Sequence, residues 1–258
     1  MTLNFIFKEV YLNQREEFSN AKVICADGKN LSFLSDNSLD AIITDHPYDI
    51  KKSNNGGDRH FAVYDCFQYT QEDFNEKARV LKPGCFLVEF LPEENGDNWE
   101  YLTKIKQMAK NAGFVYYAKV PWTKLGFVSN CGRKSKNTED VLFFTKGKAR
   151  SLRPDAKKDK AEPDKKHFMS GANGMLPTSF VFQKEKNMIH QAEKPVDLLE
   201  CIIEYITLPD ELILDQFAGS GVLGIAARNT GRNSILMEIN ETFYQNIINR
   251  LHERKGEV

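Results

Sequence analysis

Apolar residues along this chain fall into short uninterrupted runs, separated by longer segments in which apolar and charged positions alternate with a helical period. Uninterrupted runs of this length are typical of strands buried on both faces of a sheet, whereas the longer segments are typical of amphipathic helices. Alternation of the two predicts an α/β fold. The runs that we interpret as strands cover residues 23–25, 39–45, 85–90, 114–118, 141–145, 212–214 and 234–239.

Helices are predicted between these runs, at residues 71–80, 99–112 and 222–229, and in the roughly 20 residues after Ile239. Pro83 and Gly84 predict a turn that closes the first helix and starts a strand, since proline cannot continue a helix and glycine tolerates positive φ. A further helix begins near Pro195 and carries one apolar stripe, which predicts core packing. The stripe consists of Leu198, Leu199, Ile202, Ile203 and Ile206.

The regular pattern fades between residues 147 and 191 and then resumes. This stretch is rich in charged residues, glycine and proline, which is typical of an insertion or small subdomain. We therefore expect three parts in a single domain: residues 1–146, an insert at residues 147–191, and residues 192–258.

The 258 residues include 35 basic and 36 acidic side chains, which give a net charge of −1. Any contact with a polyanion must therefore come from local clustering and not from overall attraction. One such cluster lies at residues 146–166, which contain nine lysines or arginines and four acidic residues. A solvated surface loop explains the same composition equally well.

The five cysteines lie far apart in the sequence, with no C-x-x-C pair, which favours reduced thiols in a cytoplasmic protein. The first eleven residues lack the apolar region of a signal peptide, and no stretch approaches the length of about 18 apolar residues needed to cross a membrane. The scattered histidines and cysteines offer no convincing metal-ligand set. We therefore expect neither a membrane association nor a bound metal.

The sequence Gly219-Ser220-Gly221-Val222-Leu223-Gly224 comes after the predicted strand that ends at Asp215. Glycines at this spacing let the backbone approach a nucleotide closely, and Glu238 at the end of the next strand is placed to accept hydrogen bonds from ribose hydroxyls. Taken alone, the pattern serves NAD, FAD or S-adenosylmethionine equally well, and a simple packing turn is a further alternative.

A nicotinamide enzyme in the usual strand order needs several more strands after this unit, but only one helix remains. The rest of the sheet must come from upstream sequence, where Asp45-His46-Pro47-Tyr48 comes after an apolar run. In this permuted order the chain resembles the amino-directed DNA methyltransferases, the N6-adenine/N4-cytosine group, of the β class. Individually weaker matches lie at Asp27 and at residues 80–84, 122–124, 139–144 and 194–200.

This resemblance implies a class I S-adenosylmethionine-dependent methyltransferase, with a Rossmann-like sheet and a small target-recognition insert. The catalytic half would be residues 1–146 and the cofactor-binding half residues 192–258. In the family, the acid at Asp27 lies near the cofactor's adenine, although a solvated turn aspartate is the alternative. The positions implied for S-adenosyl-L-methionine are Asp27, Lys194, Asp215, Phe217, Ala218, Gly219, Ser220, Gly221 and Glu238.

The implied catalytic residues are Asp45, His46, Pro47 and Tyr48. An exocyclic amine is a poor nucleophile because its lone pair is delocalised into the base. The Asp45 carboxylate and the His46 carbonyl would each accept one amino hydrogen, Pro47 would stiffen the turn, and Tyr48 would stack on an extruded base. A tetrapeptide of this kind, taken alone, also fits an ordinary turn after a strand.

The family's usual tetrapeptide is D-P-P-Y, so His46 is a departure that loses a φ restraint. We interpret His46 as a tolerated variant, and the alternative is a role in pH response or base contact. Aspartate in the first place is commoner among adenine-directed members, which favours N6-adenine. The alternatives are an N4-cytosine enzyme, an RNA methyltransferase, and a non-catalytic DNA-binding accessory protein.

DNA is the expected partner, with phosphate contacts from the cluster at residues 146–166. A loop at residues 54–61 is expected either to order over the flipped nucleotide or to be a passive surface loop. Because the recognition insert is short, a homodimer is a further expectation, as is pairing with a cognate restriction endonuclease.

Overall fold

The computed structural model describes residues 15–48, 66–125, 137–152, 171–183 and 193–252. The loop expected at residues 54–61 and most of the basic cluster at residues 146–166 lie outside these ranges. Within the described residues, nine strands form one sheet in the order β1-β2-β9-β8-β3-β4-β6-β5-β7. The strands are β1 (Arg15–Glu17), β2 (Ala21–Cys25), β3 (Leu39–Thr44), β4 (Leu81–Pro92), β5 (Phe114–Leu125), β6 (Thr138–Lys146), β7 (Phe180–Gln183), β8 (Leu212–Asp215) and β9 (Asn233–Glu238).

Five neighbouring strands in the middle of the sheet, β2, β9, β8, β3 and β4, are parallel to one another. Every residue of β3 and β8 is buried, as expected for strands covered on both faces. From β8 the chain crosses to β9 on one side, whereas from β3 it crosses to β4 on the other. The sheet therefore has a topological switch point between β3 and β8, where α/β proteins bind their ligands beyond the carboxyl ends of the strands.

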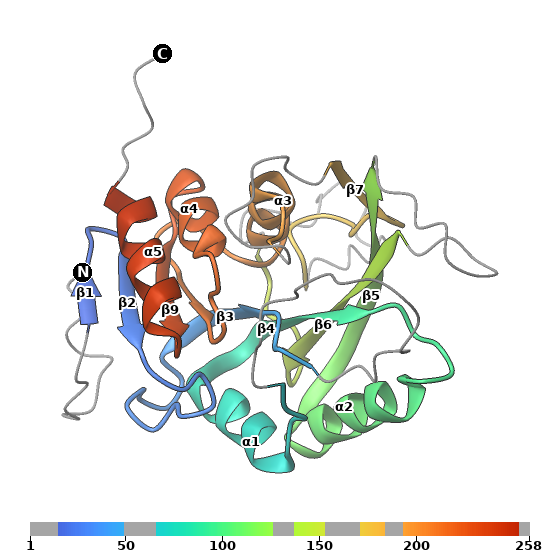
Figure 1. The fold of residues 1–258 in the computed structure, drawn as a ribbon. Helices are drawn as coiled ribbons and strands as arrows, with labels where there is room; N and C mark the ends of the chain where they lie inside the picture. The colour runs from blue at the N-terminus through green and yellow to red at the C-terminus, as the bar shows by residue number, and fades with distance from the viewer. Residues whose placement is uncertain (1–14, 49–65, 126–136, 153–170, 184–192, 253–258) are drawn as a thin grey trace, which may run out of the picture.

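Helices cover both faces of the sheet (Figure 1). One face carries α1 (Gln71–Val80) and α2 (Trp99–Asn111), and the other carries α3 (Val196–Ile206), α4 (Val222–Asn229) and α5 (Glu241–His252). Buried apolar residues form two corresponding clusters, one on each face. The predicted α/β architecture is confirmed.

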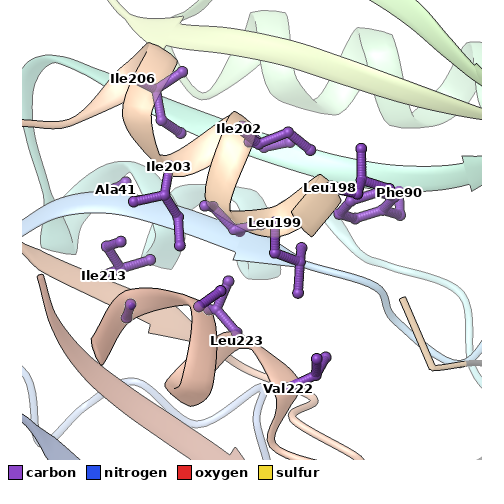
Figure 2. Packing of buried hydrophobic residues seen from close by; sticks show 14 of the residues in the cluster. Ala41, Phe90, Leu198, Leu199, Ile202, Ile203, Ile206, Ile213, Val222 and Leu223 are labelled. Carbon is purple, nitrogen blue, oxygen red and sulfur yellow. The ribbon is translucent and has the colours of Figure 1, made fainter. Parts of the chain in front are cut away.

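The apolar stripe of α3 packs on the sheet and on α4, as the sequence predicts (Figure 2). Leu198, Ile202 and Ile203 are fully buried, and the stripe lies over Ala41 of β3 and Ile213 of β8. Burial of each such side chain contributes about 1.5–3 kcal/mol of transfer free energy. This packing fixes the position of the residues that immediately precede α3.

Two strands were not predicted, and among the others β4 and β5 differ most from their predicted extent. β1 is three exposed charged residues at the sheet edge and gives no apolar signal, whereas the apolar residues of β7 form only a three-residue run within a stretch without periodicity. β4 begins at Leu81, before the predicted turn, because Leu81 already pairs with Leu39. The register shifts before the next pair, Ala41 with Phe86, and Gly84 at φ +77° lies in that interval. β5 runs on to Leu125 because its pairing with β6 continues through Pro121.

The amino-terminal ends of β3 and β8 are joined by ion pairs around Asp40. Its carboxylate accepts hydrogen bonds from the Lys82 ammonium at 2.7 Å and from the Leu212 amide at 3.0 Å. Arg150 binds Glu211 through both guanidinium NH2 groups, which ties the start of the expected insert to this end of the sheet. These charges are paired locally, so they hold the strands in register at the end opposite the switch point.

No helix within the described ranges combines the length and the apolar character that a membrane crossing requires.

Candidate active site

The tetrapeptide that starts at Asp45 and the turn after Asp215 meet at the switch point of the sheet. β3 and β8 pair in parallel, with Ala41 opposite Ile213, so both strands end at the same edge. Just beyond this register, the Thr44 hydroxyl donates a hydrogen bond to the Asp215 carboxylate at 3.3 Å. Two segments that are about 170 residues apart in sequence therefore form one site.

Asp45 belongs to a network of four alternating charges. Its Oδ2 atom lies 2.5 Å from the Lys194 ammonium, which also contacts Glu139 at 3.0 Å. Glu139 in turn accepts a hydrogen bond from Lys124 at 2.5 Å. Lys194 is buried and lies beside the rings of Phe90 and Trp122. Its position immediately before Pro195 and α3 holds it against Asp45.

The network sets the ionisation of its members in different directions. Burial raises the pKa of Asp45, and the Lys194 ammonium acts against that rise. Lys194 and Lys124 hold the pKa of Glu139 at about 2 in spite of its burial, so Glu139 remains a carboxylate. The two carboxylates raise the pKa of Lys194, which therefore remains a cation. Burial and the Lys194 cation thus act in opposite directions on the pKa of Asp45.

The other three residues of the tetrapeptide make contacts in different directions. The His46 imidazole is fully buried, so it faces the protein interior and is not accessible to a base. The Pro47 carbonyl accepts a hydrogen bond from the Phe67 amide at 3.0 Å. The Tyr48 ring is half-buried and meets the His46 ring edge-on, with 5.4 Å between centroids. Burial also raises the pKa of the Tyr48 hydroxyl, which stays protonated.

The glycine-rich turn closes tightly between β8 and α4. The Ala218 amide donates to Met237 of β9 at 2.8 Å, and the Gly221 amide donates to the Ala218 carbonyl at 2.7 Å. Gly221 has φ +73°, and a Cβ atom there would lie 2.7 Å from Ile247. Ser220 is buried, whereas no atom lies within 4 Å of the Cβ position of Gly219. The turn thus needs glycine for its backbone and faces open space at Gly219.

Glu238 connects this turn to the end of β9. One carboxylate oxygen accepts a hydrogen bond from the Gly219 amide at 2.9 Å and the other accepts one from the Asn240 amide at 2.8 Å. Burial raises its pKa, and the backbone donors act against that rise. An acid held this way at the rim of the turn retains lone pairs for further donors.

Asp27 lies at the same edge, in the turn after β2. Its side chain is exposed and accepts a hydrogen bond from the Lys29 amide at 2.9 Å. The adjacent Gly28 packs so closely on the Gln216 backbone that a Cβ atom would lie 1.9 Å from the Gln216 oxygen. The side-chain amide of Gln216 also donates a hydrogen bond from Nε2 to the Gly28 carbonyl at 2.7 Å. The Asp27 turn and the segment after β8 therefore form one unit.

Asp215 and Phe217 complete the set of residues predicted to bind a cofactor. Burial raises the pKa of Asp215 to about 7, although the Phe217 amide and the Thr44 hydroxyl both donate to its carboxylate. The charges of Asp45 and Glu238 contribute to the same rise. The Phe217 ring lies against Phe67, with 5.3 Å between centroids.

All thirteen predicted site residues lie at or next to the carboxyl ends of β2, β3, β8 and β9, or at the start of α3. Sequence reasoning missed the partners that hold them, chiefly Glu139, Lys124, Tyr69, Tyr101 and Glu89. Glu139 and Lys124 lie in segments that the sequence analysis matched to the family. The match drew attention to these segments but did not indicate the ion pairs that the two residues form. The others gave no signal, because charged and aromatic residues in helices and strands are usually read as surface or core.

Residues 39–250 of this chain match the family model of the N6/N4 DNA methylases. That match spans far more than half of the sequence and both halves of the site. The chain belongs to the N6/N4 DNA methylase family. Transfer of a methyl group to DNA is therefore the reaction class of this methylase, and the family covers both adenine N6 and cytosine N4 as target atoms.

One curated relative of the methylase is the type II methyltransferase M.HpaI of Haemophilus parainfluenzae. It is 27% identical over 240 residues, which cover 89% of this chain and 74% of the relative. The expected family is thereby confirmed.

Solved structures of similar fold include M1.HpyAVI in complex with SAM, with a TM-score of 0.62 and 24% identity over 89% of this chain and 99% of the other. Another is the cytosine-N4-specific PvuII DNA methyltransferase, with a TM-score of 0.64 and 16% identity over 93% of this chain and 89% of the other. These likenesses confirm the class I methyltransferase fold.

The contact between Gly28 and Gln216 predicts that Gly28→Ala destabilises the methylase. The added methyl group would overlap the Gln216 backbone, which cannot rotate away like a side chain. Overpacking of this kind typically costs about 1–3 kcal/mol, measured as the free energy of unfolding in denaturant. Gly96→Ala is the matched control, because no atom lies within 4 Å of its Cβ position and its φ is not positive. Equal stability of the two variants would contradict the prediction.

Proposed function

We propose that this methylase transfers the methyl group of S-adenosyl-L-methionine to the exocyclic N6 amine of adenine in DNA. The observation that supports this most directly is the meeting of two loops at the switch point. The carboxylate of Asp45 and the glycine-rich turn after Asp215 lie at neighbouring strand ends, joined through Thr44. An amine held by one loop would therefore lie next to a methyl donor held by the other.

The residues at the turn fit S-adenosyl-L-methionine, which supplies a methyl group activated by a sulfonium. Gly219 borders open space, so the turn can receive a ligand against its backbone. Glu238 keeps acceptor capacity for the two ribose hydroxyls, and the exposed Asp27 carboxylate is the group assigned to the adenine end. Phe217 would add an apolar surface beside it. M1.HpyAVI, with the same fold, was solved with SAM bound.

Asp45 and the His46 carbonyl are assigned to the target amine. Oδ2 of Asp45 accepts a hydrogen bond from Lys194. We therefore assign Oδ1 of Asp45 as the acceptor of an amino hydrogen. The His46 carbonyl accepts the second hydrogen, and the lone pair of the nitrogen is left directed at the methyl donor. Holding reactants in line in this way can lower the barrier by about 7–11 kcal/mol.

Tyr48 is assigned to the base itself. Its half-buried ring is backed by the His46 ring, so one face can stack on a base that has left the duplex. As the nitrogen gains positive charge during transfer, the Asp45 carboxylate stabilises it. The proton then leaves to Asp45 or to water.

Adenine is favoured by the aspartate in the first place of the tetrapeptide, which is the commoner choice in adenine-directed members. Cytosine N4 is the second candidate, and the likeness to the cytosine-N4-specific PvuII enzyme favours it. Incubation with methyl-labelled cofactor and duplex DNA, followed by digestion to nucleosides, separates the two. We expect label in N6-methyladenine; label in N4-methylcytosine, or in RNA supplied instead of DNA, would overturn the choice of target.

The type II designation of M.HpaI suggests a cognate restriction endonuclease as partner. Recognition of the DNA sequence is assigned to residues 147–191, of which β7 joins the sheet edge beside β5. This assignment, the homodimer and the cytoplasmic location stay predictions from the sequence.

Replacing the catalytic carboxylate with Asp45→Ala should abolish turnover while leaving cofactor affinity intact. Loss of one preorganised group at the reacting centre typically lowers kcat by at least about 10²-fold. Lys194 keeps Glu139 as a partner in the variant, although it then shares that carboxylate with Lys124. Methyl incorporation into DNA and calorimetric titration with cofactor measure the two effects. Asp97→Ala, an exposed site, is the control; wild-type turnover of the Asp45 variant would remove the assignment.

The Glu238→Gln variant should bind the cofactor more weakly at unchanged kcat under saturating cofactor. The amide keeps an acceptor for one backbone N–H but loses the charge that strengthens hydrogen bonds to the ribose, a loss of about 1.5–3 kcal/mol and so of roughly 10–100-fold in Kd. Calorimetric titration measures this. Glu204→Gln on the exposed face of α3 should leave the Kd unchanged; an equal Kd in both variants argues against the ribose contact.

Removing the cation beside Asp45 should move the acid limb of the pH profile. Lys194 lowers the pKa of Asp45 against the rise caused by burial, so Lys194→Met should raise that pKa and shift the acid limb of kcat/KM to higher pH. Lys194→Arg keeps the charge and should restore the limb towards its wild-type position. If the limb stays in place and only the cofactor Kd changes, Lys194 acts on the cofactor alone.

A further inference from the structure

Between Asp45 and Pro47, the side chain of His46 leaves the catalytic loop and enters the protein, away from the substrate side. Its Nε2 atom lies 2.7 Å from the Tyr101 hydroxyl of α2. The same hydroxyl accepts a hydrogen bond from the Tyr69 amide at 3.0 Å. The His46 and Tyr69 rings are also in contact in a tilted arrangement, with centroids 4.0 Å apart and an angle of 36° between planes. One phenol oxygen thus joins the catalytic loop to the segment that precedes α1.

A buried ion pair lies on the other side of the imidazole. Lys77 of α1 and Glu89 of β4 bind each other and are both fully buried. Glu89 also accepts a hydrogen bond from the Tyr69 hydroxyl at 3.4 Å. Its carboxylate lies 3.8 Å from the Nδ1 atom of His46, which has no hydrogen-bond partner among the described residues. The groups that surround the imidazole therefore come from α1, α2, β4 and the segment before α1.

The chemistry of these neighbours determines where the single imidazole proton lies. Burial and the nearby Lys77 ammonium lower the pKa of His46, so the ring is neutral. The Tyr101 oxygen accepts from Tyr69, which leaves its own hydrogen to be donated to Nε2. We therefore assign the proton to Nδ1, the ring nitrogen that faces the Glu89 carboxylate at 3.8 Å.

We propose that the His46 side chain is a positioning residue that anchors the catalytic loop to Tyr101 and Tyr69, in place of the φ restraint that proline provides in the family's usual tetrapeptide. The His46 carbonyl and the Asp45 carboxylate are in the same short loop, so an anchor on the His46 ring fixes the direction of both. Tyr48 rests edge-on against the same ring. This inference rests on the proposed function, because it assigns the anchor to the groups that hold the target amine.

Two matched substitutions separate the two sides of the imidazole. The amide of His46→Gln reaches as far as Nε2 and can still accept from Tyr101, whereas that of His46→Asn ends near the position of Nδ1 and cannot. Tyr101→Phe removes the hydroxyl and keeps the ring. For each variant we would measure kcat, KM for DNA, cofactor Kd and Tm, together with the double variant His46→Asn/Tyr101→Phe.

We expect kcat to fall by roughly 10–100-fold in His46→Asn and in Tyr101→Phe, since small displacements of reacting groups are costly in this range. His46→Gln should retain kcat within about threefold, and cofactor Kd should not change in any variant. Because both single variants break the same contact, the double variant should lose little more than either one, in kcat and in Tm. Wild-type kcat in both single variants, additive losses in the double variant, or equal loss in the Gln and Asn variants would overturn the proposal.

The Tm measurements keep this proposal distinguishable from the proposed function. If the wild-type protein methylates neither DNA nor RNA, the proposed function fails. Non-additive Tm losses at positions 46 and 101 would in that case still support the anchor, and additive losses would reject it.

Discussion

The parallel pairing of β3 with β8 is the constraint on which the rest of the site depends. Since the two strands run side by side and end together, the residues at their carboxyl ends must share one small space. Asp45 comes directly after β3, and Asp215 is the last residue of β8. Two carboxylates, with Glu238 close by, are thus brought to a buried edge, where like charges and lost hydration both oppose ionisation.

Cations from distant parts of the chain compensate for this accumulation of acids. Lys194 reaches Asp45 from the start of α3, and Lys77 balances Glu89 beneath the same loop from α1. Each helix is fixed by its own apolar packing, so the cations need no flexible reach to find their partners. Buried ion pairs of this kind add little net stability, but loss of one partner is expensive. The pairs therefore specify the position of the loop more than they stabilise the fold.

The sequence predicted the two features that carry strong local signals, the buried strands and the glycine-rich turn. Leu198 to Ile206 form an apolar stripe with a helical period, and Gly219, Gly221 and Gly224 have the spacing of a nucleotide-binding turn. β1 escaped prediction because its three residues are all charged, and β7 because its apolar run is only three residues long and lies in a stretch without periodicity. The contacts of Lys194, Tyr101 and Glu89 escaped it for a different reason. Each of these contacts joins residues that the strand order of the sheet brings together, and such long-range contacts cannot be predicted from local sequence.

The raised pKa of Asp215 has a thermodynamic consequence of its own. Because burial raises this pKa to about 7, the carboxyl gives up its proton far less readily than an exposed aspartate does. A ligand that places a positive charge nearby favours the ionised form of Asp215. Its binding therefore releases, on average, a fraction of a proton per molecule into solvent. Linkage then requires that acidification weakens the association, and that the heat of binding varies with the ionisation enthalpy of the buffer.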